Sequence, residues 1–449
     1  MTTCCQIVLI KTIKFSFMED TRIEKLGNYI LDIAAGPFGS NLKVECFVPT
    51  GFPIIDGANL KGFKVTDNVS KFVTEAKARS LHRSIAKRND VVVTISGNVG
   101  QISYIPEESA YEEYLVSQRQ FRVTFDTSRV YVPYLVYYFH TLEGQHKILS
   151  FANQTGVPAL AQPLKNFKNI DIVLPSLVEQ QQIAEVLKSL DNKIEVNRRI
   201  NDNLEQQAQA LFKSWFVDFE PFRDQPFVES ELGMIPEGWR VVSFKDFIEV
   251  STEKAPVDCY PEYSVTNKGI IPRNTKFNKK LSKSSSKNKV LKKNDLVFGM
   301  SREILNWGIM EDEVGGVSSA YNVYKIDKGI VSPTYLRLYM KARISDFNSL
   351  IGTAAREGQS LDKGQLLQKQ IYIPTIAALQ DFLDLFLPIT ETQLNYREES
   401  RRLSELRDTL LPRLMSGELS VDGLKGQFAV SPGQHPGAKA ISPGQHPGA

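Results

Sequence analysis

The fold of this chain is decided by residues 172–219, IVLPSLVEQQQIAEVLKSLDNKIEVNRRINDNLEQQAQALFKSWFVDF. The stretch begins as a short apolar strand pattern, breaks at Pro175, and contains no proline or glycine from Ser176 to Phe219. Apolar residues recur there at alternating steps of four and three, which is typical of a coiled-coil seam. At about 1.5 Å per residue, such a helix would be roughly 60 Å long, which exceeds the width of a small domain.

The predicted seam of this helix is apolar at both ends and more polar in its middle. Its positions are Ile183, Leu187, Leu190, Ile194, Asn197, Asn201, Leu204, Ala208, Leu211 and Trp215. Polar residues at seam positions usually set the register and the number of partner helices at some cost in stability. We therefore expect a partner helix with a similar polar centre.

The same chain supplies a candidate partner, because the stretch repeats after 199 residues. IYIPTIAAL (371–379) aligns with IVLPSLVEQ (172–180), and Pro374 falls on Pro175. The second seam is predicted at Phe382, Phe386, Ile389, Gln393, Tyr396, Ser400, Leu403, Arg407, Leu410 and Leu414. Antiparallel pairing would place polar centre on polar centre, although a parallel pairing also fits the pattern. Pro388 is expected to kink or break the second helix, which would leave the first as the more continuous one.

A repeat with a period near 200 indicates two whole domains, each followed by its own long helix. KNDLVFGM (293–300) repeats RNDVVVTI (88–95), and SPTYLRLYM (332–340) repeats VPYLVYYF (132–139). Short strand patterns alternate with amphipathic helices, so we expect a mixed α/β fold. The predicted segments are an N-terminal extension (1–21), a first domain (22–175), a central long helix (176–219), a second domain (220–375), a distal helical region (376–421) and a disordered tail (422–449) that contains SPGQHPGA twice.

The motifs that are missing narrow the chemistry. The sequence contains no GxxxxGK[ST] loop, no glycine-rich dinucleotide turn, no Asn-Pro-Pro-aromatic element, no HExxH and no CxxC. Its four cysteines lack paired metal spacing and are too sparse for a disulfide framework, so a reducing cytoplasm is expected. No apolar run approaches the ~20 residues that span a membrane. We therefore predict no catalytic residue and no metal site, and we interpret Asp90 and Asp295 as turn caps.

The remaining candidate chemistry is a basic segment in each domain. Residues 61–88 hold eight lysines and arginines against two acids, and residues 268–293 hold ten with no acid. Lys and Arg neutralise phosphates, whereas Asn, Gln, Arg and Ser read base edges. Taken by itself, the GPFGS turn (36–40) favours a surface turn without a binding role. With this turn included, the predicted DNA-binding residues of the first domain are Gly36, Phe38, Gly39, Ser40, Asn41, Lys77, Arg79, Arg83, Ser96, Asn98, Gln101 and Arg119. Those of the second are Lys276, Lys279, Lys280, Lys283, Lys287, Ser301, Arg302, Asn306 and Arg356.

The pattern resembles the specificity (S) subunit of type I restriction-modification systems. The resemblance extends over about residues 22–421. It rests on the helix stretch quoted above, on the boundary IPEGW (235–239), and on the turn GPFGS (36–40). It implies two similar target-recognition domains separated by two long antiparallel coiled-coil helices, with an internal pseudo-two-fold repeat. It also implies that the chain is a non-catalytic subunit that binds a bipartite, asymmetric duplex DNA site, with one half-site per domain.

The resemblance further implies partners. Two modification (methyltransferase) subunits would dock on the helices and the adjoining surface, and restriction (translocase/nuclease) subunits would join the assembly. S-adenosylmethionine, ATP and Mg would bind those partners rather than this chain. Two other hypotheses stay open from the residues: a coiled-coil scaffold that binds only proteins, with lysines for solubility, and an enzyme whose site is not obvious.

Overall fold

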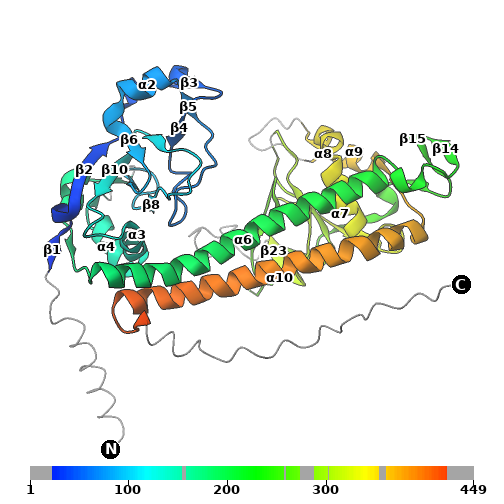
Figure 1. Ribbon diagram of the computed structural model, residues 1–449. Coiled ribbons are helices and arrows are strands. Elements are labelled where there is room, and N and C mark those ends of the chain that lie inside the picture. Colours follow the sequence, from blue (N-terminus) through cyan, green and yellow to red (C-terminus); the bar gives the residue numbers. More distant parts are fainter. Residues whose placement is uncertain are drawn as a thin grey trace, which may run out of the picture. The chain divides into compact units, whose positions relative to one another are not determined.

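The structure, a computed structural model, describes residues 23–153, 158–256, 259–273, 288–301, 303–352 and 361–421 (Figure 1). The chain divides into two compact units. Unit 1 comprises Met1–Val196 and Glu399–Ala449, and unit 2 comprises Asn197–Glu398. Each unit therefore contains one α/β body and a segment of each long helix. Among the described residues, no helix combines the length and apolarity needed to cross a membrane.

Unit 1 begins with short strands and 3-10 turns and ends in helices. Its elements are β1 (Glu24–Lys25), η1 (Leu26–Tyr29), β2 (Ile30–Ala35), η2 (Gly39–Asn41), η3 (Val44–Cys46), β3 (Phe47–Val48), β4 (Phe52–Ile55), β5 (Phe72–Val73), α2 (Glu75–Ser80), η4 (His82–Ser84), β6 (Ile85–Lys87), β7 (Val91–Thr94), β8 (Ile102–Tyr104), β9 (Glu113–Val116), β10 (Gln120–Phe125), α3 (Val132–His140), α4 (Leu142–Leu149), β11 (Ala152–Asn153), β12 (Ala159–Leu160), α5 (Pro163–Lys168), β13 (Asp171–Ile172) and α6 (Leu177–Phe216), which continues into unit 2.

The central sheet of unit 1 has the strand order β2-β10-β7-β8 with antiparallel neighbours. The run Val91–Thr94 is buried on both faces, which explains its continuous β-branched sequence. One face packs on α3 through Leu135, Val136 and Phe139. A second sheet in the described residues has the order β3-β5-β4-β9-β6 and carries its own smaller clusters.

Unit 2 follows a similar order of elements. They are η5 (Glu220–Phe222), β14 (Phe227–Ser230), β15 (Gly233–Pro236), β16 (Arg240–Ser243), η6 (Phe244–Asp246), β17 (Ile248–Ser251), β18 (Tyr263–Thr266), β19 (Gly269–Pro272), β20 (Lys289–Lys292), β21 (Leu296–Phe298), β22 (Trp307–Ile309), β23 (Val314–Val317), β24 (Asn322–Ile326), α7 (Pro333–Ala342), α8 (Ile344–Phe347), η8 (Asn348–Leu350), α9 (Lys363–Gln368), β25 (Gln370–Ile373) and α10 (Ile376–Met415), which returns to unit 1.

The two units repeat one framework, which confirms the repeat expected from the sequence. The sheet order β17-β24-β21-β22 of unit 2 matches β2-β10-β7-β8 of unit 1. In each unit, an early strand pairs with the strand that directly precedes a long helix: β1 with β13, and β16 with β25. The turns before β7 and β21 also agree, since Asn89 and Asn294 both adopt left-handed backbone angles. The mixed α/β class is therefore correct.

The long helices are antiparallel within unit 1. Ile183 and Leu187 of α6 pack in one cluster with Leu410 and Leu414 of α10. Further along α6 and further back on α10, Asp191 Oδ1 lies 2.7 Å from Arg407 Nη1, and Lys193 lies 3.4 Å from Glu399. The Arg407 guanidinium also lies over the Phe63 ring, which ties α10 to the α/β body.

Unit 2 shows the same antiparallel order. The Gln393 amide donates to the backbone oxygen of Asn201 at 3.3 Å and to Glu205 Oε2 at 3.4 Å. Beyond these polar contacts, Phe212 and Phe216 of α6 meet Phe382 of α10 in edge-to-face geometry. The polar centres of the two seams therefore face polar residues, as the pattern predicted.

Two predictions about the helices are wrong. The structure keeps α10 helical for 40 residues through Pro388, the same length as α6, so α6 is not the more continuous helix. Phe382 and Phe386, which precede this proline within two helical turns, are almost fully buried and stack on each other. This packing offsets the lost backbone hydrogen bond. The predicted seam also slips, because Phe212 and Phe216 are buried while Leu211 and Trp215 are only partly buried.

Candidate nucleic-acid interface

Most of the residues predicted to bind DNA in the first domain lie at one edge of the central sheet of unit 1. Because neighbouring strands are antiparallel, β2 and β7 end where β10 and β8 begin. The loop after β2 contains Gly36, Phe38, Gly39, Ser40 and Asn41, the β7–β8 loop contains Ser96, Asn98 and Gln101, and the turn before β10 contains Arg119. We call these loops, residues 36–43, 94–101 and 117–120, the reading edge.

Direct contacts join the three loops. The Gly36 amide donates to Gln120 O at 2.8 Å, and the Ile95 amide donates to Arg119 O at 2.7 Å. Ser96 forms a bridge to Ala159, which adds the β11–β12 region to the same edge. The three loops therefore form one surface, although they come from separate parts of the sequence.

Close approach to backbone requires glycine at Gly36 of the GPFGS turn, whereas Gly39 lies against the end of a flexible side chain. A Cβ on Gly36 would lie 1.9 Å from the Ser117 carbonyl oxygen, and one on Gly39 would lie 2.7 Å from Gln118 Oε1. Neither position has a left-handed backbone angle, so at Gly36 the backbone contact and not the conformation explains the residue type. The turn is thus pressed against residues 117–118.

The side chains at the reading edge differ in availability. Phe38, Ser40, Asn41, Asn98 and Arg119 are exposed. Gln101 is half-buried, and its Oε1 accepts a hydrogen bond from the Thr94 hydroxyl at 3.4 Å. The exposed set could contact a ligand directly, whereas Gln101 supports its own loop.

The charge of the reading edge is one-sided. Its three loops contain Lys43 and Arg119 but no aspartate or glutamate. The adjoining segment 158–162 is also free of acids. A polar surface with cations and no carboxylate suits a polyanion, because no local charge opposes the phosphates.

Fewer cations of the basic segment 61–88 are available to bind phosphates than its sequence suggested. Five of its eight cations form ion pairs within the domain. These pairs are Lys64–Glu108, Lys71–Asp56, Arg79 with Glu75 and Glu113, Lys87–Glu113 and Arg88–Glu112. Among the predicted residues, Arg79 is thereby neutralised, while Lys77 and Arg83 have no ion pair in the described part of the chain.

Arg83 belongs beside the reading edge. It lies in η4, where the next residue, Ser84, donates its hydroxyl hydrogen to Ala35 O at 2.9 Å, directly before the GPFGS turn. The Arg83 carbonyl accepts from Nε of the buried Arg122 at 2.9 Å. Lys77 lies on α2 and is half-buried.

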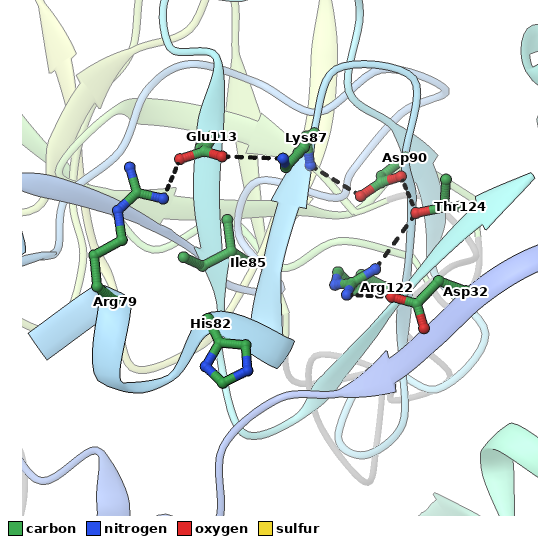
Figure 2. A pocket seen from close by; sticks show the side chains of 9 residues that line it. All are labelled: Asp32, Arg79, His82, Ile85, Lys87, Asp90, Glu113, Arg122 and Thr124. Atoms are coloured by element: carbon green, nitrogen blue, oxygen red, sulfur yellow. Dashed lines mark hydrogen bonds and ion pairs between the residues drawn. The ribbon is translucent and has the colours of Figure 1, made fainter.

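A cavity of about 350 Å³ lies behind η4 (Figure 2). Its lining residues are Asp32, Arg79, His82, Ile85, Lys87, Asp90, Glu113, Arg122 and Thr124. Arg122 pairs with Asp32 at 2.6 Å, and this hydrogen bond lowers the pKa of Asp32. Because the arginines and Lys87 already have carboxylate partners or hydrogen bonds to the backbone, the cavity has little positive charge to offer a phosphate.

Asp90 is a structural residue of this cavity. Its carboxylate accepts from the Lys87 amide at 2.9 Å and from the Thr124 hydroxyl at 2.6 Å. Burial raises the pKa of Asp90. Asp295 accepts from the Lys292 amide at 2.9 Å in the same way. Both aspartates therefore cap turns, as predicted.

The matching edge of unit 2 is built differently. Ser301 is buried, and its hydroxyl accepts from the Asn306 amide at 2.8 Å, while Gly299 N donates to Asn306 O at 2.8 Å. These bonds close the β21–β22 loop, so Ser301 organises the loop and does not present its hydroxyl outward. The predicted residues Lys276, Lys279, Lys280, Lys283, Lys287, Arg302 and Arg356 lie outside the described residues.

Sequence reasoning missed Gln118. Its side chain is exposed at the reading edge and its Oε1 lies against the position of Gly39. The run SQRQ (117–120) was a usable signal, since it places three long polar side chains at a turn. Within the described residues, no group of three or more His, Cys, Asp or Glu side chains could hold a metal ion.

These features define a two-unit protein with a repeated α/β body and two long helices. Residues 50–206 match the family described as Type I restriction modification DNA specificity domain. The MjaIX type I restriction enzyme specificity subunit of Methanocaldococcus jannaschii is 27% identical, with 78% of this chain and 82% of that relative covered. The HindI specificity subunit of Haemophilus influenzae is 24% identical, with 71% and 84% covered.

A solved structure agrees at the level of the fold. The S subunit of a type I restriction-modification system from M. genitalium has a TM-score of 0.50 and 14% identity, with 88% of this chain and 96% of that chain covered. Residues 50–206 thus match a type I restriction-modification DNA specificity domain, and the chain as a whole is similar to specificity subunits of these systems. The resemblance noted in the sequence is confirmed.

Proposed function

We infer that this chain is the non-catalytic subunit that gives a type I restriction-modification complex its DNA sequence specificity. It binds a bipartite, asymmetric duplex site, with one half-site for each unit. It docks two modification subunits and the restriction subunits in the cytoplasm, and S-adenosylmethionine, ATP and Mg bind those partners. The relatives named above are specificity subunits, which supports this role.

One observation supports the bipartite site most directly: the same four-strand framework recurs with different loops. The β7–β8 loop reads ISGNVGQ (95–101), whereas the β21–β22 loop reads GMSREILN (299–306). The turn before β10 is SQRQ (117–120), whereas the turn before β24 is SSAY (318–321). A shared scaffold with different side chains at its edge suits two readers of different base sequences.

The test is selection from randomised duplex DNA by the full chain, alone and with its modification subunit. We expect a two-part motif with an unselected spacer. We also expect log K to fall linearly with log salt, because phosphate contacts release counterions. A single contiguous motif would contradict the bipartite proposal, and binding without salt dependence would favour a protein-only scaffold.

A pair of variants assigns one half-site to unit 1. Arg119→Ala should weaken discrimination in one half of the selected motif by about tenfold or more and leave the other half unchanged. Lys25→Ala is the matched control, since it removes one positive charge from β1 of the same unit, where Lys25 pairs with Asp171 of β13. Equal loss in both halves of the motif would contradict one half-site per unit.

A further inference from the structure

The reading edge contains an aromatic side chain, that of Phe38, which is not packed against the rest of the described protein. Phe38 is 83% exposed, although the neighbouring Pro37 is buried. Phenylalanine is normally among the more buried residue types, because its ring gains much from leaving water. A single exposed apolar residue is common on protein surfaces, so its exposure alone does not indicate a function. A role for Phe38 is therefore inferred from how its backbone is held and from which residues surround it.

The backbone that carries Phe38 is held on both sides. Before it, Gly36 is bonded to Gln120 O and pressed against Ser117, as described above. After it, the Asn41 amide donates to Phe38 O at 2.8 Å and closes η2. Leu42 then enters a buried cluster with Phe52 and Ile54. The turn therefore displays Phe38 from a fixed base.

The neighbours of Phe38 are hydrogen-bonding and cationic groups. Gly39 lies against Gln118, and the following residue, Arg119, extends its guanidinium to within 3.9 Å of where a Gly97 Cβ would lie. Gln118, Arg119 and Asn98 are exposed, and the loops around them carry no carboxylate. This charge pattern complements a polyanion.

We propose that Phe38 is an apolar wedge that contacts the bases of the unit 1 half-site at a single base step. Apolar side chains that reach between bases partly unstack a step and kink the duplex, and aromatic rings also stack on bases. The adjacent Gln118 and Arg119 supply the polar base and phosphate contacts that position the ring. This inference rests on the proposed function, because it names a further specificity-determining residue at the same surface.

The experiment uses the full chain and a duplex that the wild-type protein has selected from a randomised library. Phe38→Ala should lower affinity for this duplex at least tenfold. Its slope of log K against log salt should stay unchanged, because no phosphate contact is lost. Its thermal unfolding should also match wild type, since the ring is exposed. Leu142→Ala is the matched control, because Leu142 is an apolar residue of unit 1 that is 92% exposed on α4 and should leave affinity unchanged.

Two optical readouts locate the ring. Phe38→Trp should keep the affinity and show a change of indole emission on DNA binding that wild type, with its three tryptophans, lacks. A 2-aminopurine placed at successive positions of the half-site should brighten at one step with wild type and not with Phe38→Ala.

The outcomes separate the two proposals. If the wild-type chain selects no duplex, the proposed function fails. If wild type selects a motif but Phe38→Ala binds it equally well, or no 2-aminopurine position responds, only the wedge is overturned. A Phe38→Ala variant that loses affinity for the modification subunit and keeps its DNA affinity would assign the ring to a protein contact instead.

Discussion

At the residue scale, the GPFGS turn shows how a sequence motif can be explained by one atomic contact. The carbonyl of Ser117 occupies the place where a Gly36 side chain would begin. This contact joins the turn to the start of β10, so the shape of the reading edge depends on a residue that has no side chain.

Gly36→Ala should therefore lower the free energy of unfolding of unit 1 by about 1–3 kcal/mol, because backbone must move to admit the methyl group. It should also weaken DNA binding. Urea unfolding and duplex affinity measure the two effects. Gly62→Ala is the control, since a Cβ there would meet nothing within 4 Å. Similar behaviour of both variants would show that the turn can relax.

A second residue-scale prediction concerns the charge of Asp90. Its raised pKa means that the folded state disfavours the charged form, mainly through burial. This penalty is present above the folded pKa and disappears as the pH falls through it. Asp90→Asn cannot titrate, so wild type should gain stability relative to this variant on acidification.

The measurement is urea unfolding of wild type and Asp90→Asn at neutral and mildly acidic pH. The difference between the two proteins at each pH removes the contribution of the other carboxylates, because both proteins contain them. Asp90→Ala serves as the reference, because it leaves the Lys87 amide without its cap and should cost about 1–3 kcal/mol at neutral pH. A difference between wild type and Asp90→Asn that does not change with pH would contradict the buried charge.

At the element scale, α10 tolerates a proline in its interior. Pro388 is exposed, so its ring contributes little packing, and it cannot donate to the helix. Phe382 and Phe386, on the two turns before it, are buried in the unit 2 core. Tertiary packing therefore maintains a helix that local preference alone would interrupt.

Pro388→Ala should raise the free energy of unfolding of unit 2 by up to ~3 kcal/mol, because it restores a backbone donor and a favourable helix residue. Chemical denaturation monitored by helical circular dichroism measures this. Asp381→Ala, at another exposed position of α10, controls for helix propensity and should gain much less. A destabilised Pro388→Ala variant would mean that the proline fits a required bend.

At the scale of the whole molecule, each unit contains a segment of both long helices. The chain passes from unit 1 to unit 2 between Val196 and Asn197 and returns between Glu398 and Glu399. We further propose that the two helices set the distance between the half-sites, so a change in helix length should change the length of the spacer in the DNA motif.

Insertion of one heptad at both crossing points should lengthen each helix by about 10 Å, the rise of about three base pairs. We expect a longer spacer between half-sites whose bases are unchanged, measured by selection from randomised duplexes. Insertion in α6 alone is the control and should destabilise the pair, because it shifts the register against α10. Altered half-site bases or an unchanged spacer would contradict the spacer role.

Much of the fold was predictable because its signals are local or repeated. A four-three apolar spacing and the absence of glycine and proline indicate a long helix from any window of residues 176–219. The recurrence of this stretch at residues 371–414 then indicated the domain duplication, and it predicted that the polar centres of the two helix seams face each other. The seam slipped at Phe212 and Phe216 because α6 also packs on the unit 2 body, which periodicity alone does not contain.

The candidate site was only partly predictable. The loops containing Gly36, Asn98 and Arg119 were each identified, yet their meeting at one edge follows from antiparallel strand pairing between distant segments. The lysine and arginine run of residues 61–88 suggested phosphate contacts. In the structure, ion pairs within the domain, such as Lys64–Glu108 and Arg79–Glu113, neutralise most of these positive charges.

Hydrophobic periodicity and motif recurrence indicated the repeated α/β bodies, the two long helices and the family resemblance, because both are properties of the chain order. The tertiary structure was needed to show which cations of residues 61–88 lack an ion pair among the described residues, that α10 continues through Pro388, and that an edge without acidic residues exposes Phe38. The reason is that these three features depend on contacts between residues far apart in the chain, and a local sequence pattern contains no information about the energies of such contacts.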